Sequence, residues 1–292
     1  MNDYCVFIVT NGRPVRQVTY KTLRKQNYTG KIFFIVDDQD KTASKYKEIY
    51  GDSVIIFDKA AVASDVDLGD NRKDLRTVLI ARNACHNIAL SLGFRYYIVM
   101  DDDYDHFGWI FNHRHEFIQR RPKIKSLDKT FQIMFDFYKQ TSLSSLAMFQ
   151  GGDFIGGYST TYAKKIFCHR KCMQTFFCST DRKVNWVSRL NDDVSTYITT
   201  QQRGDTQMMS INHTYVHQGT TQRHAGGMTE EYLDSGTYVK SFYSVMFAPN
   251  AVTIRMMGDK HKRLHHNTKW SAVAPLFVSE KHKKSNLARI EP

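Results

Sequence analysis

The stretch Tyr96–Asp103, which reads YYIVMDDD, joins a strand-like apolar run directly to three carboxylates. An uninterrupted run of this kind is typical of a strand buried on both faces, as in a parallel sheet between helices. In such folds, ligands bind at the edge where the strands end. Clustered carboxylates at that edge repel one another, and hard divalent ions prefer oxygen ligands and often share a nucleotide's phosphates. The stretch therefore predicts an α/β fold with a Mg²⁺ or Mn²⁺ site, and the alternative is an exposed acidic turn.

The chain before this stretch alternates strand-like and helix-like segments. Residues 5–10, 31–36 and 53–57 are rich in β-forming apolar residues, and the first two end in turn residues. Apolar residues recur at helical spacing over residues 74–92, and residues 15–26 also favour a helix. Strands separated by helices predict a Rossmann-like, mainly parallel sheet with helices on both faces.

The alternation loosens after about residue 110. Residues 127–140 and 191–202 favour helices, and residues 146–158 favour strands and close-packed loops. No stretch has the composition of a linker, so we expect one continuous domain. We divide it into a nucleotide-sugar-binding half (residues 1–110), an irregular acceptor-binding and catalytic half (residues 111–250) and a basic C-terminal segment (residues 251–292).

Composition narrows the class of protein. A hydrophobic fraction of 41% in 292 residues excludes a disordered chain. No apolar run approaches the roughly 20 residues that span a bilayer, and the first residues do not resemble a signal peptide, so we expect a cytoplasmic protein without a membrane partner. Five cysteines make a disulfide framework unexpected. The cluster Cys168, His169, Cys172 and Cys178 leaves structural zinc open as an alternative to reduced thiols.

The formal net charge of +12 indicates a polyanionic partner, with nucleic acid foremost. The charge is uneven, because Lys, Arg and His crowd the C-terminal segment and a second basic run covers residues 114–129. A generic solvated surface is the alternative. The candidate DNA-binding residues are Lys260, Lys262, Arg263, His265, His266 and Lys269.

Three motifs together resemble the GT-A glycosyltransferases. They are FIVT at residues 7–10, IVDD at residues 35–38 and an Arg-Asn pair at residues 82–83, on the helix before the acidic strand end. The resemblance spans residues 5–105 and implies a nucleoside diphosphate sugar as donor. It implies that Asp103 is the principal metal ligand and that Asp101 meets the ribose or the metal. It also implies that Arg82 contacts the nucleotide, for which a solvated charge on the helix is the alternative. The residues that it places against the nucleotide are Thr10, Arg13, Asp37, Asp38, Arg82, Asn83, Asp101 and Asp102.

A second acidic site, Asp192-Asp193, opens the helix expected over residues 191–202. Capping of that helix is one explanation for these carboxylates. In inverting GT-A enzymes, which this chain resembles, an acidic pair at such a position supplies the general base, although Asp here replaces the commoner Glu. The resemblance also implies a late histidine as third metal ligand, for which His217 and His224 are candidates. Backbone amides of the Gly/His/Thr-rich residues 217–227 can bind phosphate.

The GT-A motifs, the basic charge and the sequence HHNTKW at residues 265–270 most resemble the phage TET-associated glycosyltransferases. That resemblance implies transfer of a sugar, with UDP-sugar as the expected donor, to the hydroxymethyl group of 5-hydroxymethylcytosine in duplex phage DNA. The target base would have to leave the stack. Trp109, Phe149, Phe154 and Tyr158 are candidates to support it.

Three other functions stay open at this point. The same fold could glycosylate a polysaccharide or a protein. Clustered aspartates could serve a two-metal nucleotidyltransferase or nuclease, and a catalytically silent DNA-binding module would need neither the metal nor a nucleotide sugar.

Overall fold

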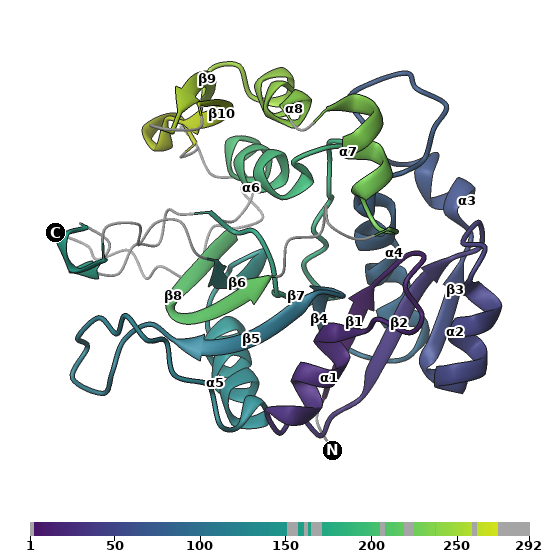
Figure 1. The fold of residues 1–292 in the computed structure, drawn as a ribbon, viewed down its shortest axis with the longest axis horizontal. Coiled ribbons are helices and arrows are strands. Elements are labelled where there is room, and N and C mark those ends of the chain that lie inside the picture. Colours follow the sequence, from purple (N-terminus) through teal and green to yellow (C-terminus); the bar gives the residue numbers. More distant parts are fainter. Residues whose placement is uncertain are drawn as a thin grey trace, which may run out of the picture.

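The computed structural model describes residues 3–150, 157–160, 163–164, 171–204, 208–218, 225–236, 238–258 and 262–273. An eight-stranded sheet in the order β3-β2-β1-β4-β7-β6-β8-β5 forms its centre, with helices on both sides (Figure 1). The predicted α/β fold class is therefore confirmed. The strands of this sheet are β1 (Tyr4–Val9), β2 (Ile32–Asp37), β3 (Val54–Phe57), β4 (Tyr96–Asp101), β5 (Tyr104–Trp109), β6 (Ser145–Gln150), β7 (Phe176–Ser179) and β8 (Met208–Gln218).

The half of the sheet made of β3, β2, β1 and β4 is parallel throughout. The register pairs Val9 with Asp101, so β1 and β4 end side by side. The turn after β1 and the aspartate cluster therefore share one edge of the sheet. That edge is where the sequence predicts ligand binding.

The other half of the sheet is mixed. Strand β7 is antiparallel to both β4 and β6, β6 is parallel to β8, and β5 is antiparallel to β8. Because β5 begins at Tyr104, directly after the aspartate cluster, the chain passes from the parallel half to the far edge of the sheet at this point.

Alternate residues of the central strands enter two separate cores. Phe7 and Val99 lie in the core that α4 (Val78–Ser91) and α6 (Asp192–Gln202) cover. Ile8 and Ile98 lie in the core that α1 (Val18–Lys25), α2 (Ala43–Tyr50) and α5 (Leu127–Lys139) cover. A strand buried on both faces needs apolar residues at every position, which explains the unbroken apolar runs.

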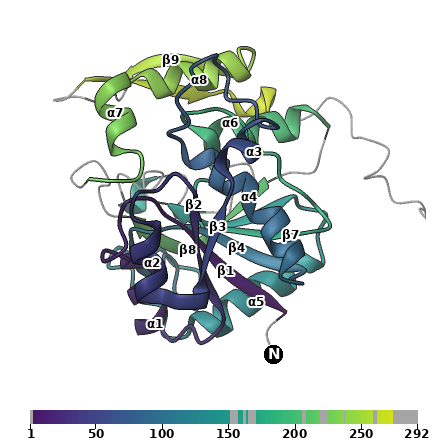
Figure 2. The same cartoon turned by 90° about the vertical axis from the view of Figure 1, so that its right-hand side faces the viewer.

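The last described part of the chain packs over α6, away from the large sheet (Figure 2). It contains α7 (Thr229–Ser235), α8 (Val239–Phe247) and a two-stranded antiparallel sheet of β9 (Val252–Met257) and β10 (Arg263–Thr268). Helix α8 packs against α6, β9 and β10. The short helix α3 (Lys59–Ala63) follows β3.

Two helices begin later than their sequence patterns indicate. Helix α4 begins at Val78, not at Asp74, because the carboxylate of Asp74 accepts hydrogen bonds from Arg76 and the side chain of Thr77 caps the helix. Helix α1 begins at Val18 rather than Val15.

No helix within the described ranges is long and apolar enough to cross a membrane. Cys5, Cys85, Cys172 and Cys178 are buried free thiols, and the predicted zinc alternative also involves Cys168 and His169, which lie outside the described residues.

Candidate active site

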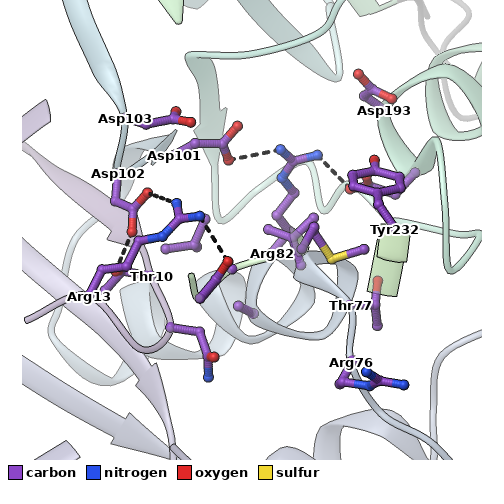
Figure 3. Close-up of a pocket in the computed structure, with 18 of the residues that line it drawn as sticks. Thr10, Arg13, Arg76, Thr77, Arg82, Asp101, Asp102, Asp103, Asp193 and Tyr232 are labelled. Atoms are coloured by element: carbon purple, nitrogen blue, oxygen red, sulfur yellow. Dashed lines mark hydrogen bonds and ion pairs between the residues drawn. The ribbon is translucent and has the colours of Figure 1, made fainter. Parts of the chain in front are cut away.

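A cavity of about 480 Å³ opens at the ends of β1, β2 and β4. The N-terminus of α6 forms its second wall, and residues from 226 to 240 form a third. Figure 3 shows the aspartate cluster and Arg82 facing this space. The predicted site residues that line it are Thr10, Arg13, Asp37, Arg82, Asp101, Asp102, Asp103, Asp192 and Asp193.

Arg82 joins the two predicted acidic sites. Its Nη2 donates to Oδ1 of Asp101 at 3.0 Å, and its Nη1 donates to Oδ2 of Asp192 at 2.5 Å. The side chain is only 5% exposed and lies over the rings of Phe176 and Trp186. Burial alone would lower the pKa of Arg82, but the charges of Asp192 and Asp101 raise it. Arg82 therefore stays charged, and the solvated helix charge considered from the sequence is not what the structure shows.

Asp192 and Asp193 lie in different surroundings although they are neighbours in the chain. Both line the cavity, but Asp192 is buried and paired with Arg82, whereas Asp193 forms none of the described salt bridges. Removal from water and, second, the charge of Asp192 raise the pKa of Asp193 to about 7. A carboxylate with this pKa can take a proton near neutral pH, which suits a general base.

Asp192 and Asp193 both lie in the first turn of α6, where carboxylates are favoured, so the helix-end explanation stands beside the pairing of Asp192 with Arg82. The residue before α6, Asn191, has a left-handed backbone (φ 52°) and provides no side-chain cap. Its amide instead bonds to Nδ1 of His266, which is buried. Asp193 accepts a hydrogen bond from the neighbouring Val194 N–H. The β10 strand thus supports the turn that presents both carboxylates.

Arg13 connects opposite walls of the cavity. Its Nη1 donates to Asp102 at 3.0 Å, while Nε and Nη2 donate to the carbonyls of Ala225 and Gly226 at 3.0 and 2.8 Å. All three guanidinium nitrogens therefore bond within the chain. A Cβ at Gly226 would lie 2.8 Å from the carbonyl oxygen of Asn11, and the residue has φ +86°. Only glycine therefore fits where residue 226 packs against the turn after β1.

The carboxylate of Asp102 points toward Arg13 and Thr10. It accepts from Thr10 Oγ1 at 2.6 Å as well as from Arg13. Desolvation raises its pKa, although Arg13 opposes that effect. Asp102 and Arg13 shape the wall of the cavity through these bonds.

At the end of β2, the carboxylate of Asp37 lines the cavity and Asp38 is exposed beside it. Lys59 lies 3.3 Å from Asp37, and the amide of Asn11 donates to Asp37 at 3.1 Å. Asp38 instead accepts from the backbone N–H of Lys59. Of the two alternatives that the sequence leaves for a nucleoside contact, Asp37 is the one in the cavity.

Asp101 and Asp103 both line the cavity, and the two carboxylate oxygens of Asp103 are buried there. Within the part of the chain that the structure describes, no three His, Cys, Asp or Glu side chains are grouped as a complete metal site. Mg²⁺ is commonly held by one or two carboxylates while phosphates and water supply the other ligands. Seven carboxylate residues and five cationic residues line the cavity, so a diphosphate would need an added cation there. The donor set fits a divalent ion bound together with a nucleotide.

Several predicted residues lie outside the cavity. The side chain of Asn83 bonds to Leu79 and Trp186 and so fixes α4 to the segment after β7. His217, on β8, pairs with Asp105 at 2.7 Å and does not line the cavity. His224, the other candidate ligand, lies outside the described residues.

The predicted DNA-binding residues that the structure describes lie on or next to the β9–β10 sheet. Lys262, Arg263 and Lys269 are exposed, and Lys260 is not among the described residues. Desolvation, with nearby Lys171, lowers the pKa of His265 to about 4, so that imidazole is neutral at pH 7. His266 is buried against Asn191, and desolvation likewise lowers its pKa, to about 3.

A buried ionic network holds the wall that α7 and α8 form. Arg189, fully buried, binds both carboxylate oxygens of Asp70, and the hydroxyl of Tyr243 donates to the same carboxylate. Although burial acts to raise it, these bonds lower the pKa of Asp70 to about 2. Arg72 binds Glu231 of α7 through two bonds of 2.6 and 3.0 Å. The segment before α4 is thereby tied to α7 and α8.

Sequence reasoning missed Lys59, Tyr232 and Lys240, all of which line the cavity. Lys59 had a local signal, since it follows the predicted strand at residues 53–57. Tyr232 and Lys240 had none, because their helices reach the cavity only through the long-range ionic network.

A sequence model of the TET-Associated Glycosyltransferase family matches residues 4–227. The match covers more than half of the chain, so the chain belongs to this family and is a glycosyltransferase, as the sequence predicts. No curated protein sequence matches the chain.

Two solved structures are among those that match this chain. Glucosyl-3-phosphoglycerate synthase from Mycobacterium tuberculosis, in complex with Mg²⁺ and UDP, has a TM-score of 0.46 at 7% identity, covering 91% of this chain and 87% of that one. Staphylococcus aureus TarS, residues 1–349 with UDP-GlcNAc, has a TM-score of 0.44 at 13% identity, covering 85% of this chain and 66% of that one.

Proposed function

We propose that this glycosyltransferase moves a sugar from a nucleoside diphosphate donor, UDP-sugar, to the hydroxymethyl group of 5-hydroxymethylcytosine in duplex DNA. The observation that carries the proposal is the meeting of two different acidic groups in one cavity. Asp101 and Asp103 offer oxygen ligands, and Asp193 offers a carboxylate with a pKa of about 7. Transfer to a hydroxyl group needs both a neutralised leaving group and a proton acceptor.

Asp101 and Asp103 would hold Mg²⁺ or Mn²⁺ together with the donor's diphosphate. The bound ion supplies neutralisation of charge on the leaving diphosphate. Arg82 donates to both Asp101 and Asp192, and it opposes the effect of desolvation, which raises the pKa of Asp192. Asp193 is the proposed base that takes the proton from the acceptor hydroxyl. This role requires inversion at the anomeric carbon.

The donor's nucleoside would lie against Asp37. A carboxylate accepts a hydrogen bond from the imide N–H that uracil carries and cytosine lacks. Asn11 and Lys59 fix the orientation of Asp37, which supports a specific contact rather than a general charge effect. These contacts fit the uracil of the proposed donor, although the amino group of cytosine could also donate to a carboxylate.

A DNA acceptor is supported by the family and by charge. The chain has a net charge of +12, and Lys262 and Arg263 are exposed next to the α8 wall of the cavity. Trp109, Phe149 and Tyr158 do not line the cavity, so any support for a flipped base must come from other residues or after a change in shape.

Incubation with hydroxymethylated duplex DNA and a panel of nucleotide sugars, each with Mg²⁺ or Mn²⁺, tests the proposal. The DNA is digested to nucleosides, and the mass of each nucleoside is measured by mass spectrometry. We expect one hexose or pentose added to 5-hydroxymethylcytosine and stoichiometric release of nucleoside diphosphate. Unmodified DNA of the same sequence serves as the control acceptor.

Other outcomes would select another function. Transfer to free saccharides or protein but not to DNA would indicate a different acceptor. Release of pyrophosphate or cleavage of the DNA would indicate phosphoryl chemistry. Binding of DNA without turnover of any donor would contradict an enzymatic role.

A further inference from the structure

Lys240 differs from the other cations of the cavity. Arg13, Lys59, Arg76 and Arg82 each form a salt bridge with an aspartate, at distances from 2.5 to 3.3 Å. Among the residues that the structure describes, Lys240 forms no salt bridge and no hydrogen bond through its side chain. An ammonium group in a cavity wall is costly to desolvate unless an anion accompanies it. The missing anion is therefore expected to arrive with a ligand.

The position of Lys240 indicates which of the two substrates would bring this anion. It is the second residue of α8, which packs against α6 and β10, and its Nζ lies 5.3 Å from the centroid of the Tyr232 ring. Figure 3 shows Tyr232 and Asp193 on one side of the cavity and Arg13 and Asp102 on the other. Lys240 therefore lies at the Asp193 side, away from the turn after β1.

Electrostatics agree with this placement. Desolvation lowers the pKa of Lys240, the charge of Asp193 opposes that effect, and Arg263 adds to it. Desolvation, followed by the charges of Lys171 and Arg263, also lowers the pKa of His265. Lys240 thus lies between Asp193 of the cavity and Arg263 of β10, whose charges act on it. The proposed donor diphosphate lies at Asp101 and Asp103 instead, so an anion at Lys240 belongs to the acceptor.

We propose that Lys240 binds a DNA backbone phosphate directly flanking the nucleotide that receives the sugar. This inference rests on the proposed function and names the subsite that would hold the acceptor. A nucleotide that leaves the duplex to reach Asp193 brings its own phosphodiesters into the site, within a few ångströms of the base. Lys240 also lies beyond residue 227, where the family match ends.

Oligonucleotides with one 5-hydroxymethylcytosine provide the test. In two of them, a neutral methylphosphonate replaces the phosphodiester on the 5′ or the 3′ side of that nucleotide. We expect Lys240→Met to raise the KM for the unmodified oligonucleotide about 10- to 100-fold, the effect of one hydrogen bond to a charged group. With one of the methylphosphonates, wild type and variant should have the same KM. The affinity for UDP should not change.

Two variants guard against misfolding. Lys240→Arg keeps the charge and should restore most of the lost affinity for DNA. Lys45→Met removes a lysine that is exposed on α2 and outside the cavity, so its KM should equal that of wild type. Thermal midpoints are measured for all three variants.

Three results would overturn the inference. Equal KM values for wild type and Lys240→Met on the unmodified oligonucleotide would show that Lys240 binds no acceptor phosphate. Weakened UDP binding would assign Lys240 to the donor. A loss that persists with both methylphosphonates would indicate a structural role. If wild type itself transfers nothing to hydroxymethylated DNA, the proposed function fails along with the inference, which is a distinct result.

Discussion

Asp101 and Asp192 share one guanidinium group. Arg82 binds the first at 3.0 Å and the second at 2.5 Å, although the two aspartates lie on β4 and α6. The proposed metal edge and the start of α6, which carries the proposed base Asp193 next to Asp192, are therefore held in fixed relation by one side chain.

Replacing Arg82 with Gln should destabilise the protein strongly. Asp192 would stay buried without its countercharge, and breaking a buried pair in this way costs about 3–5 kcal/mol. Urea unfolding measures the loss. Arg95→Gln, which breaks an exposed pair with Asp181, should leave the unfolding midpoint almost unchanged. Similar midpoints for the two variants would contradict the central role of Arg82.

Asp103→Asn should abolish sugar transfer and leave the fold intact, because it removes one carboxylate from a repulsive cluster. Titration calorimetry should show that Mg²⁺ or Mn²⁺ tightens the binding of UDP to wild type but not to the variant. Asp136→Asn, an exposed change on α5, serves as the control. Transfer at the wild-type rate by Asp103→Asn would remove Asp103 from the metal site.

The rate of transfer should depend on the protonation of Asp193. Its raised pKa of about 7 means that the carboxylate is protonated, and inactive as a base, below that pH. The value of kcat/KM for the DNA acceptor should therefore rise with pH and level off above about 7, and it should be about 100-fold lower at pH 5. Asp193→Asn should lower turnover by roughly 10²–10⁴-fold.

Donor affinity measured over the same pH range separates base catalysis from binding. If UDP binding alone followed the rate, Asp193 would not be the titrating group. A product with retained anomeric configuration would also remove the need for a base.

The β9–β10 sheet should contribute to the salt dependence of DNA binding. Each phosphate contact adds about 0.9 to the slope of log affinity against log salt. Neutralising Lys260, Lys262 and Arg263 together should flatten that slope by about 2–3 units if all three touch phosphates. His265→Ala should not change the slope, because His265 is neutral at pH 7. Equal slopes for the triple variant and wild type would show that these charges face only solvent.

The parallel half of the fold was readable from sequence because its strands are buried on both faces. Residues 5–10 and 31–36 predict β1 and β2 to within one residue at each end. Strands β5 and β8 gave no such signal, since polar and charged residues such as Asp105 and His217 alternate with apolar ones. Strand β5 is also the edge strand of the sheet, with β8 as its one neighbour.

The site was partly predictable for a related reason. Asp103 follows the end of a strand and Asp193 lies at the start of a helix. The sequence near each residue predicts that strand end and that helix start. Arg13 lines the cavity, and its side chain donates to the carbonyls of Ala225 and Gly226. No local sequence pattern predicts this contact, because the two segments are far apart in the chain. Lys240 was missed because the position of α8 depends on α6 and on the buried network around Asp70 and Arg189.

The bond between Arg13 and Gly226 joins residues 213 positions apart. During synthesis, the turn after β1 leaves the ribosome early, whereas the glycine turn that closes the cavity against it leaves much later. The parallel strands can pair as they emerge, but a nascent chain has no complete wall on that side. Capacity to retain a nucleotide sugar is consequently acquired late in translation, when most of the enzyme has already been made.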